Sequence, residues 1–339
     1  PVCRITLTSM RARLAAITAG WALFFLAAGA VSGDTFETGE IETTLVPSPV
    51  EYTVLLPTGY TTSRTDYPLL IFLHGGNGDN NFLRSVSAAF REAWAAGECP
   101  EMIVATPSCG RGFYMDYRDG SQKWESFLMR EFLPALREKY RVPDRRDDTF
   151  IGGISMGGMG SLRTAFKNPD RFAAVIALEP GIEPAFEWKD VKLEDKFWRA
   201  PELLAEIYGD PIDEEYWARN NPATIAREHA GVLRSSGLAV YIETGTRDSF
   251  GLDRGTDFLH RVLYDNQIEH EYRLVYGADH VGKSMLPRVR DALGFIGRYR
   301  NPPRVDPQVE ALHLMIRRRK RQAGPEDWGG MLRTSGRGR

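Results

Sequence analysis

The sequence predicts an α/β fold with a mostly parallel, doubly wound sheet. Short apolar runs recur through the middle of the chain, and those at 67–73 and 172–178 are continuous enough for strands buried on both faces. Segments with helical spacing of apolar residues separate these runs. Because strand and helix alternate without an internal repeat, right-handed crossovers between parallel strands are favoured.

The elements follow one another from residue 41 to residue 299. Residues 33–40 are interpreted as a polar linker, and the alternating segments 41–46 and 50–56 as two antiparallel edge strands. Further strands are expected at 67–73, 102–106, 149–154, 172–178, 238–243 and 271–275, and helices at 82–96, 122–140, directly after 154, at 256–266 and at 281–299. After the sixth strand, the mostly helical insertion 181–237 is expected to pack over the site as a partial cap.

The N-terminal segment differs from the rest of the chain. Two arginines precede an apolar run over 14–31, which ends in the small-x-small sequence Ala28-Gly29-Ala30. We interpret 1–33 as a signal peptide with translation starting at Met10, and expect a secreted or periplasmic cell-envelope protein. An uncleaved anchor is the alternative, because an apolar run of about 18 residues is at the lower limit for a membrane span.

Charge divides the remainder into an acidic domain and a basic tail. Residues 34–300 carry 31 basic and 41 acidic side chains, a net charge of −10, whereas 301–339 carry nine basic and four acidic ones. Basic residues do not gather in the folded part, which argues against a nucleic-acid partner. The tail is expected to be disordered apart from a short helix at 305–316, with Arg317–Arg321 either solvated or in contact with an anionic cell envelope.

The cysteines suggest neither a disulfide nor a metal site. Cys3 falls in the signal peptide, and Cys99 and Cys109 flank the strand expected at 102–106. A mostly extended segment of this length spans about 30 Å, far beyond disulfide reach. We expect two free thiols, and neither C-x-x-C nor His-x-x-x-His spacing indicates a metal.

A glycine-flanked serine lies between a strand and a helix. The sequence Gly153-Ile154-Ser155-Met156-Gly157 has the G-x-S-x-G pattern of a nucleophile elbow. The turn brings neighbouring backbone close to the serine, so a β-carbon at position 153 or 157 would collide. The helix N-terminus that follows favours negative charge at the site. We predict that Ser155 is a nucleophile; a structural turn serine is the alternative.

A nucleophilic serine needs a base and an orienting carboxylate, which in this arrangement follow later strands. His280 lies just past the last strand in a loop of glycine and small residues, and is predicted to be the base. Asp248 lies a few residues beyond the end of the strand at 238–243 and is predicted to be the acid. The alternatives for the acid are Asp253 and Asp257, near a helix start, and Asp279, beside the histidine.

The oxyanion of a tetrahedral intermediate needs two N–H donors. Met156, after the nucleophile, is predicted to supply the first, and Gly76 in the turn after residue 73 the second. A plain tight turn at His74-Gly75-Gly76 is the alternative. His74 in the same turn is expected to support it by hydrogen bonding. His74, Tyr114 and Trp188 are the candidate substrate contacts, the last with other aromatic residues of the insertion; ordinary packing is the alternative.

Several ordered motifs resemble the esterase-D-like esterase family, which includes S-formylglutathione hydrolases, feruloyl esterases and mycolyltransferases. The similarity extends over roughly 45–300 and rests on Leu55–Tyr60, Tyr67–Gly75, Gly153–Gly158, Tyr208–Pro211 and Thr244–Phe250. It implies an α/β-hydrolase fold without a metal or organic cofactor. The family's triad falls on Ser155, Asp248 and His280, and its second oxyanion donor on Gly76.

The resemblance implies a serine carboxylesterase acting on a small-molecule, glycan or lipid ester, and the predicted signal peptide implies its export. Acyl transfer to a sugar or lipid alcohol, of the mycolyltransferase type, is the alternative within the same chemistry. A catalytically inactive hydrolase fold used for binding is the alternative from another class, and the intact set of three triad residues argues against it.

Overall fold

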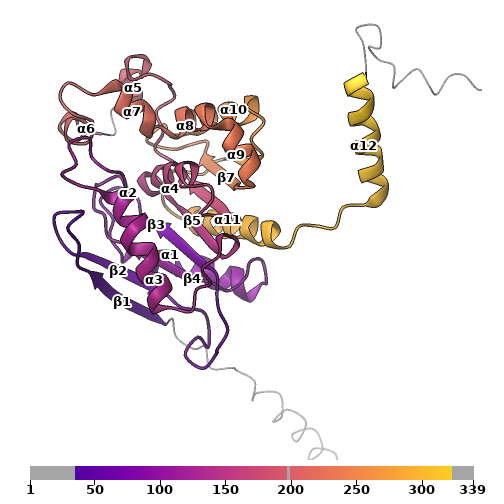
Figure 1. The fold of residues 1–339 in the computed structure, drawn as a ribbon, viewed down its shortest axis with the longest axis horizontal. Coiled ribbons are helices and arrows are strands. Elements are labelled where there is room, and N and C mark those ends of the chain that lie inside the picture. Colours follow the sequence, from indigo (N-terminus) through magenta and orange to yellow (C-terminus); the bar gives the residue numbers. More distant parts are fainter. Residues whose placement is uncertain (1–34, 197–198, 323–339) are drawn as a thin grey trace, which may run out of the picture.

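The computed structural model describes residues 35–196 and 199–322. One sheet of eight strands, in the order β1-β2-β4-β3-β5-β6-β7-β8, forms the centre of the fold (Figure 1). The predicted signal peptide lies outside the described residues. The strands are β1 Phe36–Ile41, β2 Val50–Leu55, β3 Leu69–Leu73, β4 Ile103–Pro107, β5 Thr149–Ile154, β6 Ala174–Leu178, β7 Ala239–Gly245 and β8 His270–Val275.

The sheet is antiparallel at one edge and parallel elsewhere. β2 pairs antiparallel with β1 and with β4, whereas every pair from β4 to β8 is parallel. All residues of β3, β4, β5 and β6 are buried, as strands covered on both faces require. The α/β-hydrolase fold predicted from the sequence is confirmed.

Helices cover both faces of the sheet, and the sheet separates two hydrophobic cores. Leu70 and Phe72 of β3 join the core with α1 and α11, while Leu69, Ile71 and Leu73 join the core on the opposite face with α4. The helices outside the insertion are α1 Phe82–Ala95, α2 Trp124–Phe127, a π-turn Leu128–Phe132, α3 Leu133–Lys139, a 3₁₀ turn Arg146–Asp148, α4 Met156–Lys167, α10 Asp253–Asp265, α11 Met285–Arg300 and α12 Pro307–Gln322.

The first strand lies earlier in the chain than predicted. Residues 36–41 form β1, so the linker interpretation of 33–40 and the strand at 41–46 are both wrong. β1 is an edge strand with no fully buried residue, and its pairing with β2 from Phe36↔Leu55 to Ile41↔Val50 holds it in place. An edge strand of this kind needs little apolar surface, which explains why hydrophobicity did not reveal it.

The insertion after β6 lies beside helices α4 and α10. It contains a 3₁₀ turn Trp188–Asp190, α5 Leu193–Lys196, α6 Pro201–Tyr208, α7 Glu214–Asn220, α8 Pro222–Glu228 and α9 Ala230–Ser236. α8 contacts α4 and α10. The partial cap over the site stays a prediction.

The tail contains a longer helix than expected. α12 carries the basic block Arg317–Arg321, and none of its residues is buried. Figure 1 shows α12 at the end of an extended segment, away from the sheet. Contact with an anionic envelope stays a prediction. Within the described ranges, no helix combines the length and the apolar character that a membrane crossing requires.

Candidate active site

Ser155 occupies the sharp turn between β5 and α4. Its φ of 56° and ψ of −115° are unusual for a residue with a side chain. The turn is fixed from both sides, because Ser155 N–H donates to the Leu178 carbonyl of β6 at 2.8 Å and its own carbonyl accepts from Met159 N–H at 2.9 Å. The structure therefore holds Ser155 in the strained geometry of a nucleophile elbow.

The glycines around Ser155 permit backbone contacts that no other residue allows. A β-carbon at Gly153 would lie 2.6 Å from the Leu73 carbonyl oxygen, and one at Gly157 would lie 2.2 Å from the same atom. β3, β5 and the first turn of α4 thus meet at van der Waals distance directly beneath the serine.

Ser155 and His280 line one cavity of about 770 Å³. The two predicted oxyanion donors, Gly76 and Met156, line the same cavity. The loop that bears Gly76 lies against Ser155, since a β-carbon on Gly75 would be 3.6 Å from that of Ser155. The structure brings these four predicted residues together, although they come from loops after β3, β5 and β8.

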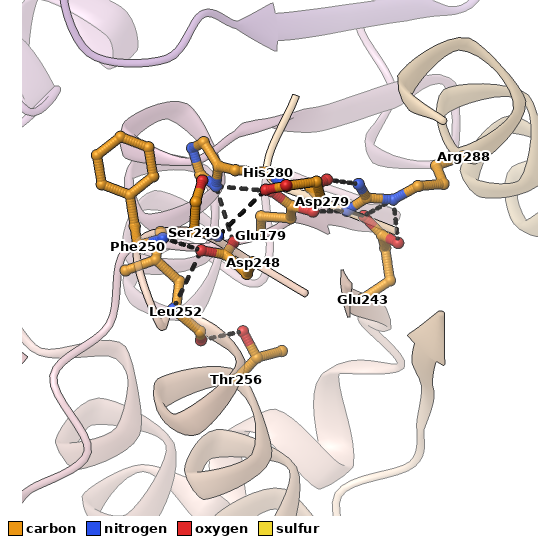
Figure 2. Close-up of polar contacts among 10 residues, drawn as sticks. All are labelled: Glu179, Glu243, Asp248, Ser249, Phe250, Leu252, Thr256, Asp279, His280 and Arg288. Atoms are coloured by element: carbon orange, nitrogen blue, oxygen red, sulfur yellow. Dashed lines mark hydrogen bonds and ion pairs between the residues drawn. The ribbon is translucent and has the colours of Figure 1, made fainter. Parts of the chain in front are cut away.

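Asp248 lies behind His280 and orients its imidazole (Figure 2). His280 Nδ1 is 2.8 Å from Asp248 Oδ2, while Asp248 Oδ1 accepts from the Phe250 N–H at 2.7 Å. Burial raises the pKa of Asp248, but the hydrogen bond with His280 and the charge of the imidazole outweigh burial and lower it overall. With Nδ1–H bonded to Asp248, Nε2 is the nitrogen left to act as a base.

A second carboxylate faces the same imidazole nitrogen. Glu179, directly after β6, places Oε2 2.6 Å from His280 Nδ1 and is fully buried. Its backbone has a φ of 46°. Sequence reasoning missed this residue; the available signal was a charged residue immediately following a fully apolar strand, at the edge where α/β folds place their sites.

Arg288 of α11 connects this carboxylate to a third one. Its guanidinium pairs with Glu179 and with Glu243 of β7, which receives hydrogen bonds of 2.9 Å from Nε and 2.7 Å from Nη2. Nη1 donates to the carbonyl of Asp279, the residue before His280, at 2.8 Å. All three ionic side chains are buried, so His280 lies against a buried network of charges (Figure 2).

The network changes the protonation equilibria at the site. Burial lowers the pKa of His280, but the close contacts with the carboxylates of Asp248 and Glu179, and their charges, outweigh burial and raise it to about 9. Burial raises the pKa of Glu243 to about 7 against the opposing effect of Arg288.

Glu179, Asp248 and His280 also have the spacing of a metal-ligand set, with one potential ligand atom from each lying within 4.8 Å of the others. Arg288 already supplies a cation to Glu179, and Nδ1 keeps a proton in its hydrogen bond with Asp248. The arrangement therefore fits an imidazole held by acids better than a cation site.

His74 and Tyr114 support the loop beside the nucleophile. His74 Nδ1 donates to the Gly75 carbonyl at 2.7 Å and Nε2 accepts from the Cys109 N–H at 3.0 Å, while the Tyr114 hydroxyl accepts from the His74 N–H at 3.1 Å. Burial lowers the pKa of His74, which keeps it neutral. Both side chains are buried and neither lines the cavity.

Trp188 lies in the insertion, where its ring packs against Trp217 with centroids 5.7 Å apart. No described residue of 181–237 lines the cavity that holds Ser155.

Cys99 and Cys109 are free, as predicted, and both are buried. Burial raises the pKa of each thiol to about 12.

A known protein family matches most of the chain. The family described as "Putative esterase" matches residues 44–284. The chain belongs to this esterase family. Among curated proteins, this esterase-family chain is similar to Esterase Rv1288 of Mycobacterium tuberculosis (strain ATCC 25618 / H37Rv), with 33% identity over 125 residues, which are 36% of this chain and 27% of that protein.

Solved structures show the same fold. A ferulic acid esterase has a TM-score of 0.64 and 25% identity, with 78% of this chain and 98% of that chain covered. An S-formylglutathione hydrolase from Agrobacterium tumefaciens also has a TM-score of 0.64, with 19% identity and 79% and 96% covered. The chain spans about a quarter of the length of the M. tuberculosis relative.

Proposed function

We propose that this esterase-family chain is a serine carboxylesterase that works through an acyl-enzyme. The observation that carries the proposal is the strained Ser155 in the same cavity as His280, whose Nδ1 is held by Asp248. A turn serine without a catalytic role needs neither the strained backbone nor the oriented base.

The chemistry follows from the positions of these groups. Ser155 Oγ attacks the ester carbonyl carbon while His280 Nε2 takes the hydroxyl proton. The carbonyl oxygen becomes an oxyanion between the N–H groups of Gly76 and Met156. As the intermediate collapses, the proton passes from His280 to the departing alcohol. Water then attacks the acyl-enzyme by the same route and releases the acid.

The cavity favours esters with an apolar group. Apolar side chains form most of its wall, and its volume of about 770 Å³ is within the usual range for small-molecule sites. The apolar lining residues are Phe82, Val86, Phe113, Ile154, Met156, Phe250, Leu252, Val281, Met285 and Leu286. We propose small to medium carboxylic esters as substrates and export through the segment 1–33. Acyl transfer would use the same acyl-enzyme with an alcohol in place of water.

The test is labelling and turnover by the purified full chain. A fluorophosphonate probe should label the wild-type protein and not Ser155→Ala. p-Nitrophenyl esters from acetate to long chains, and methyl ferulate, should be hydrolysed with a chain-length optimum that disappears in Ser155→Ala. Labelling without hydrolysis, but with ester formation when an alcohol is added, would favour acyl transfer. A folded protein that shows neither labelling nor turnover would refute the proposal.

A further inference from the structure

Two buried carboxylates approach a single imidazole N–H. Asp248 Oδ2 lies 2.8 Å and Glu179 Oε2 lies 2.6 Å from His280 Nδ1, and both carboxylate side chains are 0% exposed. The geometry of a hydrogen bond is met toward Asp248. Among the described residues, Glu179 Oε2 has no hydrogen-bond partner. A carboxylate oxygen this deeply buried is costly unless a positive charge faces it, and the imidazole is the group beside it.

The two acids follow neighbouring strands of the sheet and lie at the same edge of it. Glu179 follows β6 and Asp248 follows β7, two adjacent parallel strands whose last paired residues are Leu178 and Glu243. The Glu179 N–H donates to the Glu243 carbonyl at 2.8 Å, which extends this pairing by one residue. The carboxyl edge of the sheet thus offers two neighbouring positions for an acid, and here both are occupied.

Arg288 keeps Glu179 in place. Its Nη2 pairs with Glu179 Oε1, so the other oxygen, Oε2, points toward His280 (Figure 2). The backbone of Glu179 is in the left-handed region at a φ of 46°, a conformation that costs free energy for a residue with a side chain. Strain that persists in a buried, ion-paired residue next to a catalytic base suggests a role at that base.

We propose that Glu179 is a second positioning acid for His280, acting beside Asp248. Its charge stabilises the imidazolium that forms when Ser155 is deprotonated, and its Oε2 can accept the hydrogen bond from Nδ1–H when Asp248 is removed. The inference rests on the proposed esterase function. It makes the site a tetrad in which the two acids partly substitute for each other.

The charged groups around His280 determine the expected pH dependence. They are Glu179 after β6, Asp248 after β7, Glu243 within β7, Arg288 on α11, Asp279 in the same loop and Arg111 on the cavity wall. Base catalysis requires a neutral imidazole, so activity rises with pH through the pKa of His280. Removing a neighbouring negative charge lowers this pKa, and the rise moves to lower pH.

The experiment compares Glu179→Gln, Asp248→Asn and the double variant with the wild-type full chain. kcat/KM for p-nitrophenyl butyrate is measured from pH 5 to 10. Glu243→Gln is the matched control, because Glu243 pairs with the same arginine yet does not touch His280. Glu179→Gln should move the rise in activity down by roughly 1–3 pH units, the usual effect of an adjacent opposite charge. Glu243→Gln should move it by less than half as much.

The double variant tests whether the acids substitute for each other. Loss of the orienting acid in a serine triad usually costs about 10⁴-fold in kcat. Asp248→Asn alone should lose about 10- to 100-fold because Glu179 remains, and the double variant should approach the full loss. An unchanged pH profile in Glu179→Gln, or a double variant no slower than Asp248→Asn, would overturn the proposal.

A direct titration covers the case in which Glu179→Gln fails to fold. NMR of the wild-type imidazoles should give a histidine that is absent from the spectrum of His280→Gln and that titrates well above the ordinary value. A His280 pKa of 7 or lower would refute a second acid. These outcomes differ from failure of the esterase proposal, in which the wild-type protein itself has no turnover and no probe labelling.

Discussion

The substitution Gly157→Ala tests whether the nucleophile turn depends on close backbone contact. A β-carbon at this position would lie 2.2 Å from the carbonyl oxygen of Leu73 and 2.6 Å from that of His74. Both atoms belong to the backbone at the end of β3, which is paired with β4 on one side and β5 on the other. Because β3 cannot move away, the first turn of α4 has to shift.

The size of the effect follows from these distances. Relieving the contact takes a movement of roughly 1 Å, and a displacement of that size between reacting groups costs about 100-fold in rate. The Met156 N–H moves with the helix start, away from the oxyanion position. Overpacking against rigid neighbours also costs about 1–3 kcal/mol of folding free energy. For a domain of this size, that corresponds to roughly 2–12 °C in Tm.

The assay measures kcat/KM for p-nitrophenyl butyrate and Tm by circular dichroism. Gly294→Ala in α11 is the control, since its β-carbon would meet only Arg298 Nη1 at an ordinary 3.5 Å. Alanine is favoured over glycine in a helix interior by about 1 kcal/mol, so this control should raise Tm. A Gly157→Ala protein with wild-type Tm and kcat/KM within a factor of three would refute the steric reasoning.

Three further predictions concern the charge network, the thiols and export. Arg288→Met should lower the free energy of unfolding in urea by about 3–5 kcal/mol, because it leaves buried carboxylates without their cation; a change below about 1 kcal/mol would contradict this. Cys99 and Cys109 should react with Ellman's reagent at pH 8 only after unfolding, since burial raises the pKa of each thiol to about 12; fast reaction of the native protein would contradict burial. In an exporting bacterial host, mass spectrometry of the mature protein should show cleavage between Ala30 and Asp34, and an intact N-terminus would contradict the signal-peptide interpretation.

The parallel strands and the nucleophile turn could be predicted because both leave local signals. Strands buried on two faces, such as β3 and β6, must be continuously apolar. The turn at Ser155 needs glycine at positions 153 and 157, because a β-carbon at either position would collide with the Leu73 carbonyl oxygen. His280 and Asp248 could be located because loops after successive parallel strands meet at one edge.

Other features depend on contacts that a single sequence does not display. β1 is held by main-chain pairing with β2, so its side chains are only partly buried and carry no strong pattern. The aromatic residues of the insertion suggested a substrate pocket, yet Trp188 packs on Trp217 within the insertion itself. Glu179 is a single acidic residue whose position depends on its ion pair with Arg288, 109 positions further along the chain.

The two acids beside His280 couple the stability of the fold to catalysis. The folded-state pKa of His280 is raised from 6.5 to about 9, so the protonated imidazole stabilises the fold below pH 6.5 and this contribution is lost as the pH rises to about 9. At 1.4 kcal/mol per pH unit, the whole contribution is roughly 3 kcal/mol. Catalysis needs the opposite state, the neutral base. The difference in unfolding free energy between wild type and Glu179→Gln should therefore shrink between pH 6 and 9.5, over the range in which wild-type activity rises. Urea unfolding at the two pH values measures this, and an unchanged difference would show that Glu179 does not act through the charge of His280.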